Sequence, residues 1–311
     1  MAFNILISDK IEPVCPERLI KDGCLVDQKS GLGPEELEAI IGQYDALIVR
    51  SATKVTGKIL KTGSIGKLKI VGRAGAGLDN IDLEAAKKLG IEVVNTPGLN
   101  ANAVAELVVA FLIILSRKLG AAMSSIKAGR WEKKGLSGTE VMGKTIGLVG
   151  LGAVGRLVAA KAIGLGMKVL AYDPLISHEK IKEAGAEPAD LEALWANSDY
   201  ISLHLPKTEQ TKNLVGSEAL SKMRKGSFLI NCARGGLVDE NALHTALVEG
   251  TIAGAASDVF AQEPPGWSPL LALPNFEATP HLGASTEEAQ LAVAEKVAEL
   301  ISGYLSSLGA K

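Results

Sequence analysis

The stretch Thr145-Ile-Gly-Leu-Val-Gly150-Leu-Gly152-Ala-Val-Gly155-Arg-Leu-Val-Ala-Ala-Lys161 decides the fold. A short apolar strand leads into three glycines spaced GxGxxG, and a helical segment follows them. The first glycine permits a tight turn, the second lets the backbone approach a pyrophosphate, and the third lets the helix pack on the strand. Amides at the helix start, near Ala153 and Val154, would then hold phosphate oxygens. The alternative is a strand–helix turn that merely needs glycine.

The next predicted strand, Lys168–Tyr172, favours dinucleotide binding over that alternative. It ends at Asp173, which lies 23 residues after Gly150. A carboxylate at this place accepts hydrogen bonds from both ribose hydroxyls of an adenosine, and it repels a 2′-phosphate. The stretch therefore predicts NAD rather than NADP as the cofactor, although Asp173-Pro174 could also be only a turn.

Short apolar runs alternate with helical segments on both sides of this stretch. Such alternation predicts βαβ units and parallel sheets with both faces covered. Strands are expected at 4–8, 46–50, 69–73 and 92–95, and then at 145–149, 168–172, 200–205, 228–231, 254–258 and 277–279. Helices are expected at segments that include 34–41, 83–89, 154–165, 191–196 and 240–249. The fold class is therefore α/β, with two doubly wound parallel-sheet domains.

The position of the glycine loop indicates how the two domains are arranged along the chain. A dinucleotide-binding domain usually begins with this loop, but here about 145 residues precede it, so a complete α/β unit comes first. A long helical region from Ala101 to about Ala128 separates the two series of strands, and its apolar segment 107–115 is expected to be buried. A last helix, capped by Ser285 or Thr286 with Glu288, has no strand after it and must dock on a domain already built. We therefore expect residues 1–99 and 285–311 to form a substrate-binding domain, with the NAD-binding domain, 100–284, inserted between them.

Composition narrows the class of protein. The 311 residues include 33 basic and 35 acidic side chains, and a net charge of −2 argues against a general nucleic-acid or membrane-surface binder. Cys15, Cys24 and Cys232 form no CxxC motif, which favours a reduced, cytoplasmic compartment and no metal site. The first residues lack the features of a signal peptide.

Three polar residues follow predicted strands of the second series: Arg234, Glu263 and His281. Ligands of open α/β sheets bind beyond the carboxyl ends of the strands, so these side chains could converge on one site. Their chemistry fits hydride transfer at a secondary alcohol. Histidine can take the hydroxyl proton at neutral pH, a carboxylate can orient its ring, and an arginine can bind a substrate carboxylate through two parallel hydrogen bonds.

Each of these residues has a simpler alternative role. Arg234 could form a surface ion pair, Glu263 could be an ordinary loop residue before Pro264, and His281 could cap a turn. Among the other histidines, His178 and His244 lie in polar helical segments and are expected to be exposed. His204 ends a strand near the cofactor and is the rival base.

The sequence resembles the D-isomer-specific 2-hydroxyacid dehydrogenases over almost its whole length. The motifs that carry the resemblance are Val49-Arg-Ser-Ala-Thr-Lys-Val55, Val71-Gly-Arg-Ala-Gly-Ala-Gly-Leu-Asp-Asn80, Asn95-Thr-Pro-Gly98, Gly150-Leu-Gly-Ala-Val-Gly155, Asn231-Cys-Ala-Arg-Gly-Gly236, Asp258-Val-Phe260 and Thr279-Pro-His-Leu-Gly-Ala284. The resemblance implies a Rossmann NAD-binding domain inserted into a flavodoxin-like substrate-binding domain. Within the family, the chain looks most like the members that oxidise 3-phospho-D-glycerate, many of which carry C-terminal regulatory domains; it would be either a short form without them or a truncated piece of a longer protein.

The resemblance also implies a set of site residues. The catalytic set would be Arg234, Glu263 and His281. NAD contacts would come from Gly150, Gly152, Ala153, Val154, Gly155, Asp173, His204, Leu205, Cys232, Ala233, Arg234, Asp258, His281 and Ala284. Substrate contacts would come from Arg50, Arg73, Gly75, Ala76, Gly77, Arg234 and His281. Ala76 departs from relatives that carry a hydroxyl residue there, which puts that contact with the cofactor in doubt.

These implications lead to a hypothesis with two alternatives. The hypothesis is a cytoplasmic homodimer, paired through the 101–128 region, that converts 3-phospho-D-glycerate to 3-phosphohydroxypyruvate in serine biosynthesis. Arg50 and Arg73 each follow a strand and suit the substrate phosphate, although both could be ordinary surface arginines. The first alternative is the same chemistry on another acid, such as glyoxylate or hydroxypyruvate. The second is a non-catalytic corepressor that senses NAD.

Overall fold

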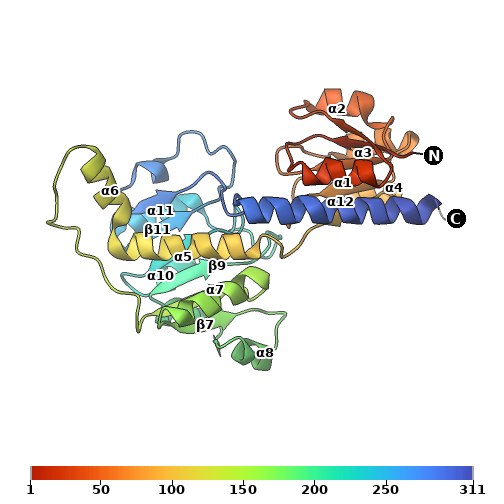
Figure 1. Cartoon of the computed structure of the whole chain (residues 1–311). Coiled ribbons are helices and arrows are strands. Elements are labelled where there is room, and N and C mark those ends of the chain that lie inside the picture. Colours follow the sequence, from red (N-terminus) through yellow and green to blue (C-terminus); the bar gives the residue numbers. More distant parts are fainter. Residues whose placement is uncertain (1, 310–311) are drawn as a thin grey trace. The chain divides into compact units, whose positions relative to one another are not determined.

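The structure is a computed structural model that describes residues 2–309, and the chain in it divides into two compact units (Figure 1). Met1–Asn100 and Ala284–Lys311 make up unit 1, and Ala101–Gly283 make up unit 2. Each unit has its own sheet, in which all the strand pairs are parallel. The expected fold class, two parallel-sheet α/β units, is confirmed.

Unit 1 is built on a five-stranded sheet of order β2-β1-β3-β4-β5. Its strands are β1 (Asn4–Ile7), β2 (Leu25–Gln28), β3 (Ala46–Val49), β4 (Ile70–Arg73) and β5 (Glu92–Asn95). Its helices are α1 (Val14–Lys21), α2 (Pro34–Ile41), α3 (Gly57–Ile65), α4 (Leu83–Leu89) and the final α12 (Glu287–Gly309). The strand order is the flavodoxin-like one, with its switch point between β1 and β3.

Both faces of the unit 1 sheet are covered, as its apolar strands require. Ile5 and Ile7 of β1 face a core shared with α1 and α12, while Leu6 faces the core under α2, α3 and α4. Figure 1 shows α12, in blue, running alongside α1. The Thr286 hydroxyl accepts a hydrogen bond from the Ala289 amide at 3.2 Å, so of the two expected caps Thr286 begins this helix. Because alternate side chains of β1 point to opposite faces of the sheet, one face of this strand packs against the final helix.

Unit 2 is built on a seven-stranded sheet of order β12-β11-β10-β9-β6-β7-β8. Its strands are β6 (Thr145–Val149), β7 (Lys168–Tyr172), β8 (Glu187–Pro188), β9 (Tyr200–Leu203), β10 (Phe228–Asn231), β11 (Gly254–Ser257) and β12 (Phe276–Ala278). Its helices are α5 (Ala101–Arg117), α6 (Leu119–Lys127), α7 (Ala153–Gly164), α8 (His178–Glu183), α9 (Leu191–Asn197), α10 (Ser217–Lys222), α11 (Glu240–Glu249) and the 3₁₀ turn η1 (Pro269–Ala272). The strand order changes direction between β6 and β9, which is where ligands of such sheets bind.

Several expected elements differ from those observed. The region expected as one helical stretch from 101 to 128 is broken at Lys118, whose φ of 52° is left-handed, and α5 and α6 meet at a bend of 73°. Only one stripe of segment 107–115 is fully buried, and Ala110 is exposed. The strand expected at 200–205 ends at Leu203, and the short β2, β8, α1, α3, α8 and α10 were not expected individually.

Other expectations about the elements hold. Strands at 92–95, 145–149, 168–172 and 228–231 and helices at 34–41, 83–89 and 240–249 have the expected bounds. No single helix within residues 2–309 is long and apolar enough to cross a bilayer, and α5 with α6 meets that criterion only as a bent pair.

Candidate active site

The glycine loop joins β6 to α7 at the switch point of the unit 2 sheet. Gly150 has a left-handed φ of 101°, and a Cβ there would lie 2.7 Å from the His204 carbonyl oxygen. A Cβ on Gly155 would lie 2.3 Å from the Gly150 carbonyl oxygen, whereas nothing lies within 4 Å of the same position on Gly152. No side chain caps α7 at Gly152. The loop is therefore closed toward the protein and open at the helix start, which fits a bound pyrophosphate.

Asp173 follows β7 and ties the end of this strand to the glycine loop. Its Oδ2 accepts a hydrogen bond from the Leu151 amide at 2.8 Å, and its Oδ1 accepts one from the Leu175 amide at 2.9 Å. A carboxylate has about four acceptor sites, so Asp173 keeps the capacity to accept ribose hydroxyls. The side chain holds the loop and also fits the expected ribose contact.

His204 follows β9 and lies beside the same loop. Its Nε2 is buried and has no hydrogen-bond partner among residues 2–309. Burial lowers the pKa of His204 from 6.5 to about 4, because the charged imidazolium is disfavoured away from water. His204 is therefore neutral near pH 7 and, with so low a pKa, a poor acceptor for a substrate proton. Of the other two histidines, His178 is exposed as expected, but His244 is half-buried, which corrects the expectation for it.

Arg234 stands on a tight turn after β10. The Asn231 side chain shapes this turn, accepting from the Ala233 amide at 3.1 Å and donating to the Arg234 carbonyl at 3.0 Å. A Cβ on Gly235 would lie 1.7 Å from the Phe260 carbonyl oxygen, so only glycine fits there. This turn fixes the backbone of Arg234, which is half-buried, at the carboxyl end of β10.

Glu263 and His281 form a hydrogen-bonded pair in unit 2. Glu263 Oε2 lies 2.7 Å from His281 Nδ1, and Glu263 Oε1 accepts from the Phe260 amide at 3.0 Å. The carboxylate is thus fixed by the backbone and in turn orients the imidazole. With Nδ1 engaged, Nε2 is the ring nitrogen left to exchange a proton with a ligand.

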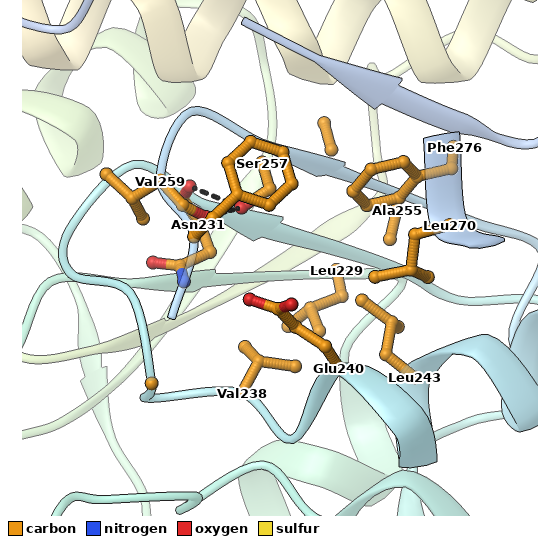
Figure 2. A pocket seen from close by; sticks show the side chains of 13 residues that line it. Leu229, Asn231, Val238, Glu240, Leu243, Ala255, Ser257, Val259, Leu270 and Phe276 are labelled. Atoms are coloured by element: carbon orange, nitrogen blue, oxygen red, sulfur yellow. Dashed lines mark hydrogen bonds between the residues drawn. The ribbon is translucent and has the colours of Figure 1, made fainter. Parts of the chain in front are cut away.

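A pocket of about 470 Å³ lies at this pair. Its polar wall consists of Asp258, Glu263, Thr279 and His281, and its apolar wall includes Pro264, Pro265 and Leu271. Figure 2 shows a different cavity, between β10, β11 and α11, into which the Glu240 carboxyl group points. That cavity measures about 10 Å³, room for at most one water molecule, so the first pocket is the candidate ligand site of unit 2.

The remaining predicted contacts of unit 2 lie at the same edge of its sheet. Ala153 and Val154 form the first turn of α7, and Leu205 follows His204. Cys232 is buried, and burial together with the nearby Asp258 charge holds the pKa of its thiol well above the usual range. Asp258 is buried after β11. Ala284 belongs to unit 1, where its carbonyl accepts a hydrogen bond from the Gln290 side chain.

In unit 1, the predicted arginines stand at the ends of neighbouring strands. Arg50 follows β3, and its Nη1 donates to the Lys10 carbonyl at 3.2 Å. Arg73 ends β4, and its guanidinium lies over Gly75: a Cβ there, where φ is 145°, would be 1.5 Å from Arg73 Nη1. The following turn is held by Asn95, whose Nδ2 donates to the Ala76 carbonyl at 2.7 Å, and Gly77 is half-buried in it. Glycine at 75 thus makes room for the arginine.

A supporting network around Arg50 was not expected from the sequence. Asp9 Oδ2 accepts from the Arg50 amide at 2.5 Å and the Thr53 amide at 3.2 Å, while Asp9 Oδ1 accepts from the Thr53 hydroxyl at 2.9 Å. Asn80 Nδ2 donates to the carbonyls of Arg50 and Thr53, both at 2.7 Å. The available signal was a polar residue directly after a predicted strand, the same signal that singled out Arg50.

The comparisons with known proteins identify the family of the chain. Residues 109–283 match the model of the family described as D-isomer specific 2-hydroxyacid dehydrogenase, NAD binding domain. A D-3-phosphoglycerate dehydrogenase of Synechocystis is 50% identical over 99% of this chain and 55% of its own length. One from Methanocaldococcus jannaschii is 45% identical over 97% of this chain and 58% of its own length. The chain therefore spans little more than half the length of these curated relatives.

A solved structure extends the comparison to the fold. The NAD⁺-bound 3-phosphoglycerate dehydrogenase of Entamoeba histolytica is 32% identical, with a TM-score of 0.83, over 98% of this chain and 96% of that one. The chain belongs to the family of D-isomer specific 2-hydroxyacid dehydrogenases, whose members are oxidoreductases. Its cofactor is NAD, as the glycine loop and Asp173 predict.

Proposed function

We propose that this chain carries the NAD-dependent oxidation of 3-phospho-D-glycerate to 3-phosphohydroxypyruvate, a step of serine biosynthesis. The Glu263–His281 pair carries the proposal, because a 2.7 Å contact between them supports a role for His281 as a general base in the unit that holds the glycine loop. The shared name of the relatives supports the choice of substrate. Glyoxylate and hydroxypyruvate remain the rival substrates. A pure NAD sensor has no need of an oriented base beside its cofactor site.

The cofactor would be held at the carboxyl edge of the unit 2 sheet. Gly150, Gly152, Gly155 and the amides of Ala153 and Val154 would bind the pyrophosphate, and Asp173 would bind the adenosine ribose. His204, Leu205, Cys232, Ala233, Asp258 and Ala284 would line the rest of the site. When bound, NAD supplies the hydride acceptor.

The protein's own groups would handle the proton and the charges of the substrate. Arg234 would bind the substrate carboxylate and orient the carbon that carries the hydroxyl. His281 Nε2 would take the hydroxyl proton as the hydride leaves that carbon, and Glu263 would stabilise the resulting imidazolium. Arg50, Arg73 and the Gly75-Ala76-Gly77 turn would take the phosphate, as their positions at strand ends in unit 1 favour.

The same proposal assigns the domains and the assembly. Residues 100–284 would be the NAD-binding domain, inserted into a substrate-binding domain of 1–99 and 285–311. The protein would be a cytoplasmic homodimer paired through 101–128. Met123 and Ile126, which are 51% and 55% exposed on α6, support that surface as a contact between copies. Light scattering on Ile126→Asp would test it, with a shift from dimer to monomer expected.

Turnover by His281→Ala tests the catalytic assignment. We expect a fall in kcat of about 10²-fold or more, the usual contribution of general acid–base catalysis, with NAD still bound. Glu263→Gln, which keeps the shape but not the charge, should fall less. A loss below about tenfold for His281→Ala would remove His281 as the base.

Comparing substrates in the reverse direction tests the assigned substrate. NADH consumption should be faster with 3-phosphohydroxypyruvate than with hydroxypyruvate or glyoxylate, at equal concentrations. Equal or faster turnover of the unphosphorylated acids would favour the rival substrates. NADH binding without turnover of any of the three would favour the sensor.

A further inference from the structure

The proposed base occupies a backbone conformation that residues with a Cβ rarely adopt. His281 has a φ of 56°, in the left-handed region. Such a conformation persists only where surrounding contacts hold it in place. The question is which contacts keep the segment Thr279–Gly283, here called the 279–283 loop, in this shape.

One buried residue makes most of these contacts. The Asp258 carbonyl accepts a hydrogen bond from the His281 amide at 2.9 Å. In the side chain of Asp258, Oδ1 accepts a hydrogen bond from the Leu282 amide at 2.6 Å, and Oδ2 accepts one from the Gly283 amide at 2.7 Å. Asp258 is only 1% exposed, so water does not compete for these donors. The aspartate binds three successive amides and thereby defines the curve of the loop around His281.

The Thr279 hydroxyl completes the arrangement from the other end of the loop. It donates to Asp258 Oδ1 at 2.5 Å, while the Thr279 amide continues the strand pairing by donating to the Ser257 carbonyl at 3.1 Å. A hydroxyl that donates to a carboxylate forms a charge-assisted bond and fixes the rotation of the carboxyl group. With Oδ1 held by Thr279, Oδ2 faces Gly283, where a Cβ would lie 3.1 Å from this oxygen.

We propose that Thr279, through Asp258, is a positioning residue for catalysis that holds the His281 imidazole against Glu263. The inference rests on the proposed role of His281 as the base and extends it to a residue outside the expected site. Thr279 itself needs no contact with the substrate for this role. A misplaced base lowers the rate of proton transfer, because the reacting atoms meet less often in the productive geometry.

The replacement of the Thr279 hydroxyl tests the inference. Thr279→Val removes the hydroxyl and keeps the shape, whereas Thr279→Ser keeps the hydroxyl. We expect Thr279→Val to lower kcat by about tenfold, the scale of one lost charge-assisted hydrogen bond, with KM and NAD affinity within about twofold of the original. Thr279→Ser should restore kcat. Thr245→Val is the matched control, since its hydroxyl donates to the Asn241 carbonyl within α11.

Two outcomes with the single variant Thr279→Val would overturn the inference on kinetic grounds. An unchanged kcat in Thr279→Val would show that the hydroxyl does not matter. An equal loss of kcat and NAD affinity would show that Thr279 acts on cofactor binding instead. A double variant gives the third check: if Thr279 acts through His281, Thr279→Val should cost no further rate in the His281→Ala background, and an additive loss would contradict this.

Hydrogen exchange separates this inference from the proposed function. In Thr279→Val, the amides of residues 281–283 should exchange at least about tenfold faster, because their acceptor is no longer fixed. The same amides should be unaffected in Thr279→Ser and Thr245→Val. Unchanged exchange in Thr279→Val would overturn the positioning role even if His281 is the base. A small effect of His281→Ala on turnover would instead overturn the proposed base. The exchange rates would then still show whether Thr279 fixes the 279–283 loop.

Discussion

The two units hold their candidate functional side chains in the same way. In each, a buried aspartate just after one strand binds the loop that follows the neighbouring strand. Asp9 follows β1 and accepts from the Arg50 amide and from Thr53, after β3. Asp258 follows β11 and accepts from Thr279 and from the amides of Leu282 and Gly283, after β12. In both cases a threonine hydroxyl is among the donors.

The difference between the two arrangements lies in how many groups share the task. The loop of Arg50 is also held by Asn80, which donates to two of its carbonyls. Among residues 2–309, no side chain other than Asp258 is seen to bond the backbone of the 279–283 loop, which carries the left-handed His281, and Glu263 holds only the imidazole ring. The loop of unit 2 should therefore be more sensitive to the loss of a single carboxylate than the loop of unit 1.

The largest expected effect follows from this difference. Asp258→Ala leaves three donors without their carboxylate acceptor, one of them buried, and we expect it to lower the free energy of unfolding by about 4 kcal/mol. Asp9→Ala should cost about 2 kcal/mol, because Asn80 still holds the loop. Urea denaturation measures both, and Asp190→Ala, which removes an exposed helix cap on α9, serves as the control at about 1 kcal/mol. An equal or greater loss for Asp9→Ala would contradict the comparison.

The next largest effect is a loss of stability in acid, which we expect in unit 2 because of His204. Burial lowers the pKa of this imidazole from 6.5 to about 4, so between those pH values the unfolded chain binds a proton that the folded chain does not. The stabilisation by neutral His204 is complete above about pH 6.5 and is lost as pH falls toward 4, a change of about 3 kcal/mol. Urea denaturation of the original protein and of His204→Asn at pH 7, 5.5 and 4.5 measures it. Parallel pH profiles for the two proteins would show that His204 is not the cause.

The smallest effect should come from the helper residue of unit 1. Asn80→Ala loosens the loop of Arg50 but leaves Asp9 in place. KM for 3-phosphohydroxypyruvate should therefore rise by about threefold, which is less than the effect of losing one full hydrogen bond to a charged group. Arg50→Ala should raise the same KM by about tenfold or more. Neither change should affect the KM for hydroxypyruvate, which has no phosphate. Equal losses for both acids would argue against a phosphate site at Arg50.

Much of the fold was predictable because its signals are local. The glycines at 150, 152 and 155 and the aspartate at 173 lie within 24 residues of each other, and the expected strand and helix around them are confirmed. The break at Lys118 was not predictable from the apolar spacing, since that spacing continues on both sides of it. A single left-handed residue leaves no trace in a periodic pattern.

The residues of the candidate site were likewise predictable only where their signal is local. Polar residues after strands drew attention to Arg50, Arg234 and His281, since the carboxyl ends of parallel strands share one edge of a sheet. Asp9, Thr53 and Thr279 were missed, and the supporting role of Asp258 was not foreseen, because the partners are distant in sequence: Asp9 and Thr53 are 44 positions apart, and Asp258 and Thr279 are 21 apart. These pairs become visible only when the strand order is known.

The sequence by itself determined the class of fold and the NAD-binding loop, since strand length, double-sided burial and glycine spacing are properties of neighbouring residues. Only the tertiary structure decided how the functional loops are held and what surrounds each candidate histidine. The His204 ring nitrogen Nε2 is buried, which lowers the pKa of this imidazole to about 4, whereas His281 is paired with Glu263. The physical reason is that hydrogen bonding and desolvation depend on groups that strand order brings together across the sheet.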